Sequence, residues 1–173
     1  MTDKHPLAAA HEVERTLKEA IFYPAHDART ESPEYAKAHH HLVVVLDLPC
    51  LVCGVRQSTL HDPAVNKVGA RDMETHHHIV EWALQNAIDL AKFNDRIWPA
   101  LKHRHPGKYE QPFTQQSMLD FIDHSEDNLW VLCDVHHRHS LVGIHAVTFP
   151  IWSAQDLVRD DFDYIEGPAD GKP

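Results

Sequence analysis

The chain carries two short patterns of metal-binding residues far apart in its sequence. Cys50 and Cys53 are separated by two residues, and the same gap separates Cys133 from His136. Thiolate and imidazole groups suit a tetrahedral zinc ion, and two such pairs can hold one ion from two chain segments. The pairs use all three cysteines, too few for a disulfide framework. We therefore predict a structural zinc site that brings both segments together; the alternative is that the thiols pack as small apolar side chains.

Length and composition are typical of one folded domain. A chain of 173 residues with 43% hydrophobic residues is large enough to bury its own core, so we expect a single domain over residues 1–173. No apolar run approaches the roughly 20 residues that a membrane helix needs. The N-terminus also lacks a basic region followed by an apolar one, which is the pattern of a signal peptide. We expect a cytoplasmic protein that does not bind membranes.

The spacing of apolar residues predicts a mixture of helices and strands, the α+β class. Apolar residues recur at helical spacing between His11 and Phe22, and a second helix is expected from Pro33 to Ala38 with Ser32 as its N-cap. Further helices are expected at 81–97, 117–124, 134–144 and 153–162. Strands are expected at 42–48, within 71–79, at 129–132 and at 147–152. The proline-containing segment 98–112 is expected to be a loop.

A second set of histidines surrounds these elements. His76, His77 and His78 stand at the end of one predicted strand, Asn128 precedes another, and His137 directly follows His136. In a chain with 17 histidines a triplet can also be surface decoration, and the other triplet, 39–41, has no partner motif. His139 and His145 are further candidates near the last motif.

At these residues the sequence resembles the HNH, or ββα-metal, nucleases. The segments that carry the resemblance are HHI at 77–79, DNLWVLC at 127–133 and DVHHRH at 134–139. Members of that family carry a CxxC pair, a His-His or Asp-His pair, an Asn before an apolar strand, and LCxxCH at the start of a helix. Here LCDVHH has His136 in place of the second cysteine. The resemblance runs from about Cys50 to His145.

The resemblance implies a hydrolytic phosphodiester site. His77 and His137 would hold a catalytic divalent metal, which could be zinc, manganese, nickel or magnesium. His78 would be the general base that activates water. Asn128 would orient His78 through a hydrogen bond and pin the loop between the strands, and Arg138 would contact a phosphate oxygen.

The resemblance also implies how the chain is organised. A ββα-metal core with its structural zinc would occupy 42–150, with a helical insertion at about 81–116 between the two core strands. An N-terminal helical region, 1–41, and a C-terminal helix with a disordered tail, 151–173, would flank it. Successive side chains of a strand point to opposite faces. His77 and His78 can therefore serve one site only if regular pairing stops near them.

Three functions are compatible with these residues. The first is a metal-dependent endonuclease acting on nucleic acid, most naturally DNA, although the net charge of −10 opposes binding of a polyanion. The basic segment 102–105 would be either a nucleic-acid contact or a solvated loop. The second is a related metalloenzyme acting on a small molecule, and the third a non-catalytic zinc-stabilised binding module. A homodimer is possible through the helix expected at 81–97 or the N-terminal helix.

Overall fold

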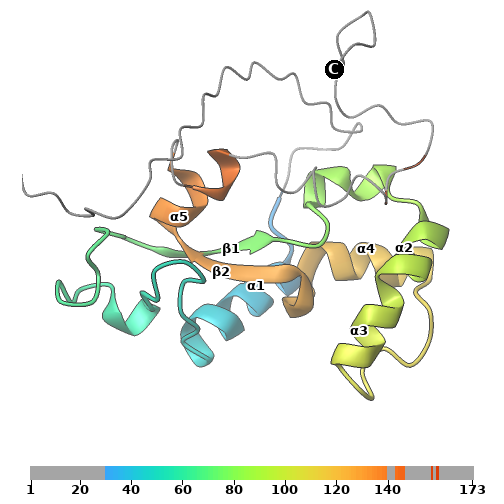
Figure 1. The fold of residues 1–173 in the computed structure, drawn as a ribbon, viewed down its shortest axis with the longest axis horizontal. Helices are drawn as coiled ribbons and strands as arrows, with labels where there is room; N and C mark the ends of the chain where they lie inside the picture. The colour runs from blue at the N-terminus through green and yellow to red at the C-terminus, as the bar shows by residue number, and fades with distance from the viewer. Residues whose placement is uncertain (1–29, 140–142, 147–156, 158, 160–173) are drawn as a thin grey trace, which may run out of the picture.

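The computed structural model describes residues 30–139, 143–146, 157 and 159. Its centre is a two-stranded antiparallel sheet with helices around it, so the α+β class is confirmed (Figure 1). Strand β1 (Met73–His77) pairs with β2 (Leu129–Cys133), in a register that runs from Met73 opposite Cys133 to His77 opposite Leu129. Both strands lie where the sequence predicted them, and β1 ends within the histidine triplet as expected.

The first described helix, α1 (Pro33–His40), begins as predicted. The Ser32 hydroxyl accepts the Tyr35 N–H at 3.0 Å, which satisfies one of the free donors at the helix start. The prediction of a strand at 42–48 is wrong, because α1 continues into a π-helical turn, His41–Val45. Leu42 and Val43 are both buried and the next three residues are exposed. That pattern fits a helical turn with one buried side, which outweighs the strand preference of β-branched residues.

The segment between the two strands, which was predicted to be an insertion at about 81–116 and is called the insertion below, is largely helical, but its elements differ from the prediction. The helix predicted at 81–97 is broken into a 3-10 turn, Trp82–Ala87, and helix α2 (Leu90–Arg96). Ile88 and Asp89 are extended at the break, and the Asp89 carboxylate accepts the Lys92 N–H to begin α2. The loop predicted at 98–112 was wrong in its first half, which forms α3 (Trp98–Arg104) with a proline in its first turn, where proline is tolerated. Helix α4 (Gln115–His124) covers the helix predicted at 117–124.

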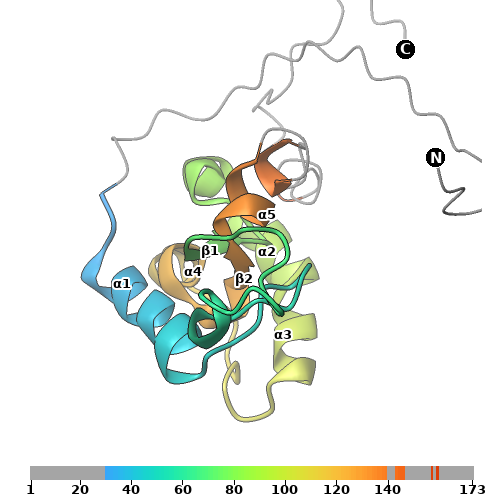
Figure 2. The same cartoon turned by 90° about the vertical axis from the view of Figure 1, so that its left-hand side faces the viewer.

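Two hydrophobic clusters form the core of the described part of the chain. The first joins the helices of the insertion around Phe93, Met118 and Phe121. The second joins α1 and the π-helical turn to the sheet around Tyr35 and Val131. Figure 1 shows α2, α3 and α4 at one end of the sheet and the chain between α1 and β1 at the other, and Figure 2 shows the same arrangement end-on.

Helix α5 (Asp134–Arg138) follows β2 directly and is shorter than the predicted helix 134–144. A 3-10 turn, Ile144–Ala146, comes after it. The helix predicted at 11–22, the strand predicted at 147–152, the tail and nearly all of the helix predicted at 153–162 lie outside the described residues. Within the described part of the chain, no helix is both long and apolar enough to cross a membrane.

Candidate metal centres

The structure brings together the four residues of the predicted zinc site. Each of Cys50, Cys53, Cys133 and His136 offers one ligand atom, and these atoms all lie within 4.8 Å of one another. The Cys53 and Cys133 sulfurs are 3.9 Å apart, and His136 Nδ1 lies 3.7 Å from Cys50 Sγ and 3.2 Å from Cys133 Sγ. Tetrahedral zinc with ordinary bond lengths would separate two sulfurs by about 3.8 Å and a sulfur from a nitrogen by about 3.6 Å. The group could therefore hold one metal ion.

Local backbone structure presents both halves of this group. The Cys50 carbonyl accepts the Gly54 N–H at 2.9 Å, closing a tight turn that Gly54 completes with a positive φ of 76°. The N–H of Leu51 donates to the Val131 carbonyl at 2.9 Å, which attaches this turn to β2. Cys133 ends β2, and His136 follows in the first turn of α5.

The cysteines differ in how readily they lose a proton. Burial raises the pKa of Cys133 to about 12. Burial also opposes ionisation of Cys50, but backbone N–H groups, that of Cys53 first among them, outweigh it and lower the Cys50 pKa below its usual value. Thiol ligands bind a metal as thiolates, so a divalent cation would displace the protons that burial otherwise retains.

A second group of ligand atoms consists of three histidines. His76 comes from β1, His137 from α5 and His145 from the 3-10 turn after it. His137 Nε2 lies 3.3 Å from His76 Nδ1 and 3.0 Å from His145 Nε2. Three nitrogens on one tetrahedral ion would be about 3.3 Å apart. Burial first, and then His137 and His145, lower the pKa of His76 to about 3, so its ring is neutral and keeps a lone pair near neutral pH.

Glu74 fixes the orientation of His137. One Glu74 oxygen accepts a hydrogen bond from His137 Nδ1 at 2.5 Å, which leaves the lone pair of Nε2 directed at the other two histidines. The second Glu74 oxygen pairs with Arg138. Arg138, predicted to contact a phosphate, is thus engaged with this carboxylate, although 65% of its side chain is exposed.

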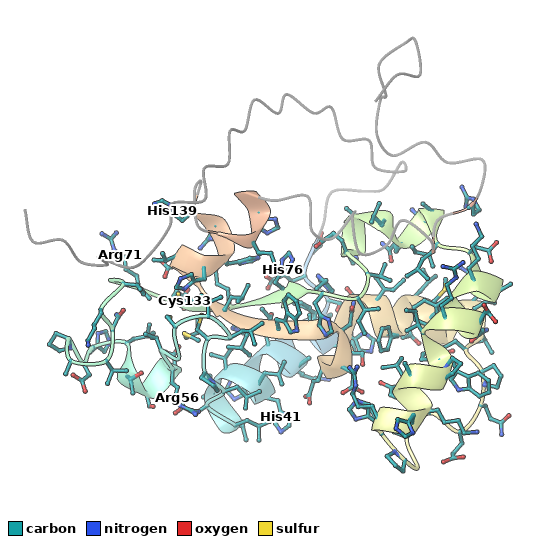
Figure 3. All side chains as sticks on the ribbon, viewed as in Figure 1. His41, Arg56, Arg71, His76, Cys133 and His139 are labelled. Atoms are coloured by element: carbon teal, nitrogen blue, oxygen red, sulfur yellow. The ribbon has the colours of Figure 1, made fainter. Side chains whose placement is uncertain are left out.

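Gly143 brings His145 back beside α5. Its N–H donates to the His139 carbonyl at 2.8 Å. A Cβ at this position would lie 2.6 Å from backbone atoms of His139 and 2.8 Å from the His137 carbonyl, closer than real contacts allow. His139 itself lies at the outer end of α5, where it is exposed and takes no part in the three-histidine group (Figure 3). Of the two further candidates in the sequence, the structure therefore selects His145.

The structure places a different histidine of β1 beside His137. The sequence suggested His77 as the partner of His137, but the ring that approaches His137 is that of His76. The alternation of a strand points Glu74 and His76 toward α5 and sends Thr75 and His77 to the other face. There His77 is 1% exposed, stacks on Tyr35 at 5.6 Å and has Nε2 3.0 Å from the Asp123 carbonyl.

His78 lies one step beyond the end of β1. Its ring stacks on Trp130 with centroids 4.7 Å apart and planes 2° from parallel. Its Nε2 is 3.0 Å from the Asp127 carbonyl, which can only accept, so Nε2 carries the proton and Nδ1 the lone pair. Burial lowers the pKa of His78, and it outweighs the raising effect of that carbonyl.

Asn128 pins the loop after β1, as expected, but its amide does not orient the His78 ring. The Asn128 side chain is fully buried; its Oδ1 accepts the N–H groups of Ile79 and Val80, at 2.9 and 3.1 Å. Its Nδ2 donates to the Val80 and Ile122 carbonyls, both at 3.0 Å. The expected hydrogen bond to His78 is made by backbone instead, since the Asn128 carbonyl accepts the His78 N–H and Asp127 holds the ring.

A pocket of about 420 Å³ opens beside the three histidines. The pocket lies along β1, and residues from both faces of β1 line it. Within the described structure, β1 pairs only with β2. His39 lines the pocket too, with Nδ1 3.2 Å from Thr75 Oγ1, whereas His41 pairs with Glu126 at 2.6 Å. His78 lies outside the lining.

No protein-family model, curated protein or solved structure matches this chain.

The chemistry that the two groups could support follows from their donor atoms. The sulfur-rich group supplies four ligands, the number that closes a structural site. Among the described residues, the three-histidine group offers three ligand atoms, and it adjoins a pocket. A metal there would keep a position open for water or substrate.

Proposed function

We propose that the protein is a metal-dependent phosphodiester hydrolase of the HNH type, with its catalytic metal on His76, His137 and His145. The observation that supports this most is the three-histidine group beside a pocket, at the point where two antiparallel strands meet a short helix. Its donor set fits zinc, manganese or nickel better than magnesium.

The metal would supply Lewis acidity to a phosphoryl oxygen and stabilise the charge that develops on it. The residues of the chain then have separate tasks. Glu74 keeps the Nε2 lone pair of His137 directed inward. His76 stays neutral because it is buried, so it binds the cation without first losing a proton.

His78 is the proposed general base. Its ring stacks on Trp130, which lies directly opposite His76 in the strand register, so His78 lies on the same side of the sheet as His76. The Asp127 carbonyl fixes the tautomer with the lone pair on Nδ1, the form that can accept a proton from water. Stacking on Trp130 holds the ring plane.

The sulfur-rich group would bind a structural zinc. Zinc there would tie the turn at Cys50–Cys53 to the junction of β2 and α5, and so fix the helix that carries His137. The proposal thus assigns one metal to stability and the other to chemistry.

Plasmid nicking in Mg²⁺, Mn²⁺, Ni²⁺ and Zn²⁺ tests the hydrolase proposal. His145→Ala should lose activity and one bound divalent ion, whereas His139→Ala, which removes an exposed histidine just after α5, should resemble the wild type. His78→Ala should lose activity but keep both metals. If the wild type cuts no faster than His145→Ala in any of the four metals, the nuclease proposal fails.

A small phosphodiester, bis(p-nitrophenyl) phosphate, separates the two enzymatic alternatives. Four carboxylates, those of Glu31, Asp72, Glu74 and Glu81, belong to residues that line the pocket and would oppose a polyanion. Hydrolysis of the small diester without nicking of DNA would point to a small-molecule substrate.

A further inference from the structure

The loop after α3 reaches across to the segment that holds His78. Side chains of His105, Lys108 and Tyr109 all meet the carboxylate of Asp127. Lys108 Nζ donates to it at 2.8 Å and the Tyr109 hydroxyl at 2.6 Å, on the same oxygen. His105 Nε2 lies 3.5 Å from the other oxygen. One carboxylate thus collects three side chains from the insertion.

The same residue holds the proposed base. The Asp127 carbonyl accepts from His78 Nε2 at 3.0 Å, and the next carbonyl, that of Asn128, accepts the His78 N–H at 2.9 Å. The side chain of Asp127 therefore faces the insertion while its main chain faces His78. A shift of Asp127 would therefore move the carbonyl that accepts the hydrogen bond from the His78 ring.

Burial and hydrogen bonds stabilise the contact of Asp127 with Lys108 and Tyr109. Only 15% of the Asp127 side chain is exposed. Burial alone would raise its pKa, but hydrogen bonds from Lys108 and Tyr109 outweigh burial and hold the Asp127 pKa below its usual value. Tyr109 is itself fixed by Phe113 and Phe121, whose ring centroids lie 5.5 and 6.2 Å from its own. Its carbonyl also accepts from Trp98 Nε1 at 2.9 Å.

We propose that the insertion positions the general base by clamping Asp127 through Lys108 and Tyr109, and so sets the tautomer and orientation of His78. This rests on the base role proposed for His78. Lys108 and Tyr109 are then positioning residues, and the basic loop serves the site from within the fold instead of binding nucleic acid. Lys102, Arg104 and His103 on α3 remain exposed.

Tyr109→Phe is the sharpest variant, because it removes the hydroxyl and keeps both the charge and the aromatic packing. It should lower kcat about tenfold with KM unchanged, the usual effect of losing a group that orients a functional residue. Lys108→Met should behave likewise. Lys102→Met is the matched control: it removes the same charge from the same insertion. The Lys102 ammonium donates to the Glu110 carbonyl at 3.4 Å and lies 5.2 Å from the centre of the Trp98 ring, and neither contact involves Asp127. This variant should leave kcat unchanged.

Long-range ¹H–¹⁵N spectra of the histidine rings give a readout that does not depend on activity. His78 should show the Nε2–H tautomer in the wild type and in Lys102→Met, and a mixture of tautomers in Tyr109→Phe and Lys108→Met. Unfolding temperature and metal content, measured beside them, should match the wild type. The clamp is refuted if Tyr109→Phe keeps the wild-type kcat and tautomer. It is also refuted if Lys108→Met and Lys102→Met change KM to the same extent and leave kcat and the tautomer unchanged.

The two proposals can fail separately. If no metal supports hydrolysis of either substrate, the proposed function fails, yet the tautomer spectra still decide whether the insertion fixes His78. If hydrolysis requires His78 but Tyr109→Phe leaves the His78 tautomer unchanged, only the clamp proposal is wrong.

Discussion

At the scale of single residues, Asn128 binds four backbone groups with one side chain. It is fully buried, and its amide satisfies two N–H groups and two carbonyls, among them both polar groups of the Val80 main chain. Asn128→Ala would leave these groups buried and unpaired. We expect a loss of about 3 kcal/mol in the free energy of unfolding, measured by urea denaturation of the metal-loaded protein.

Asn94→Ala is the control for that variant. Asn94 also bridges backbone groups, donating to the Phe113 carbonyl at 2.8 Å and accepting its N–H at 2.7 Å, but it is only partly buried. Water can replace its bonds, so we expect a loss of about 1 kcal/mol. Equal losses in the two variants would contradict the role given to Asn128.

Residue spacing alone predicted which four residues form the sulfur-rich group, but it suggested His77 for the second group, where the structure brings His76 beside His137. Cys50, Cys53, Cys133 and His136 are brought together because each half is a local turn in which a two-residue gap sets the geometry. Within the triplet, by contrast, adjacent residues differ only in which face of β1 they take. The register with β2 decides that, and here it turns His76 toward α5. The sequence still held a usable signal, since Glu74 and His76 share a face by alternation.

At the scale of elements, α5 is too short to be stable alone. It has five residues, and isolated helices below about 12 residues are marginal in water. Three consecutive side chains attach it to the rest of the fold: His136 belongs to the sulfur-rich group, and His137 and Arg138 bind Glu74 on β1. Glu74 therefore connects the sheet to the helix that offers the metal ligand.

We expect Glu74→Gln to weaken divalent metal binding at the three histidines by about 10- to 100-fold. Glutamine keeps the shape but carries no charge, so it supports the His137 ring less strongly. Calorimetric titration with Ni²⁺ measures the affinity. Glu31→Gln removes one charge from the same pocket lining without contacting a ligand histidine and should bind Ni²⁺ like the wild type. If both variants weaken binding equally, the effect of Glu74 is only its charge.

Element prediction succeeded where one periodicity dominated and failed where tertiary packing decided. The capped start of α1 and the helix near 117–124 follow from local signals. The run 42–48 looks like a strand by composition, yet it lies against α1 and the sheet with one side only. No proline or glycine at Ile88–Asp89 predicts the break in the helix. The extended backbone there forms a hydrogen bond with a distant part of the chain, because the Asp89 N–H donates to the Leu157 carbonyl at 2.9 Å.

At the scale of the whole molecule, the two hydrophobic clusters do not depend equally on metal. The cluster around Tyr35 and Val131 includes Cys50, Cys53 and Cys133, so the sulfur-rich group is part of its packing. The cluster around Phe93 and Phe121 contains none of the metal-binding residues of either group. Asn128 lies at the turn where the chain passes from the insertion into β2. Loss of the structural metal should therefore open the cluster around Tyr35 and Val131 before the cluster around Phe93 and Phe121.

Hydrogen exchange measured by mass spectrometry tests this order. The His145→Ala variant, whose catalytic metal is already lost in our proposal, is treated with a chelator so that only the structural ion changes. Exchange should rise by more than tenfold in peptides from 41–60 and 129–138, and by little in α2 and α4, because local opening is confined to the part that the metal supports. An equal rise in both clusters would mean that the molecule unfolds as one unit. No rise at all would mean that the thiols only pack against each other, and the structural zinc would then have to be abandoned.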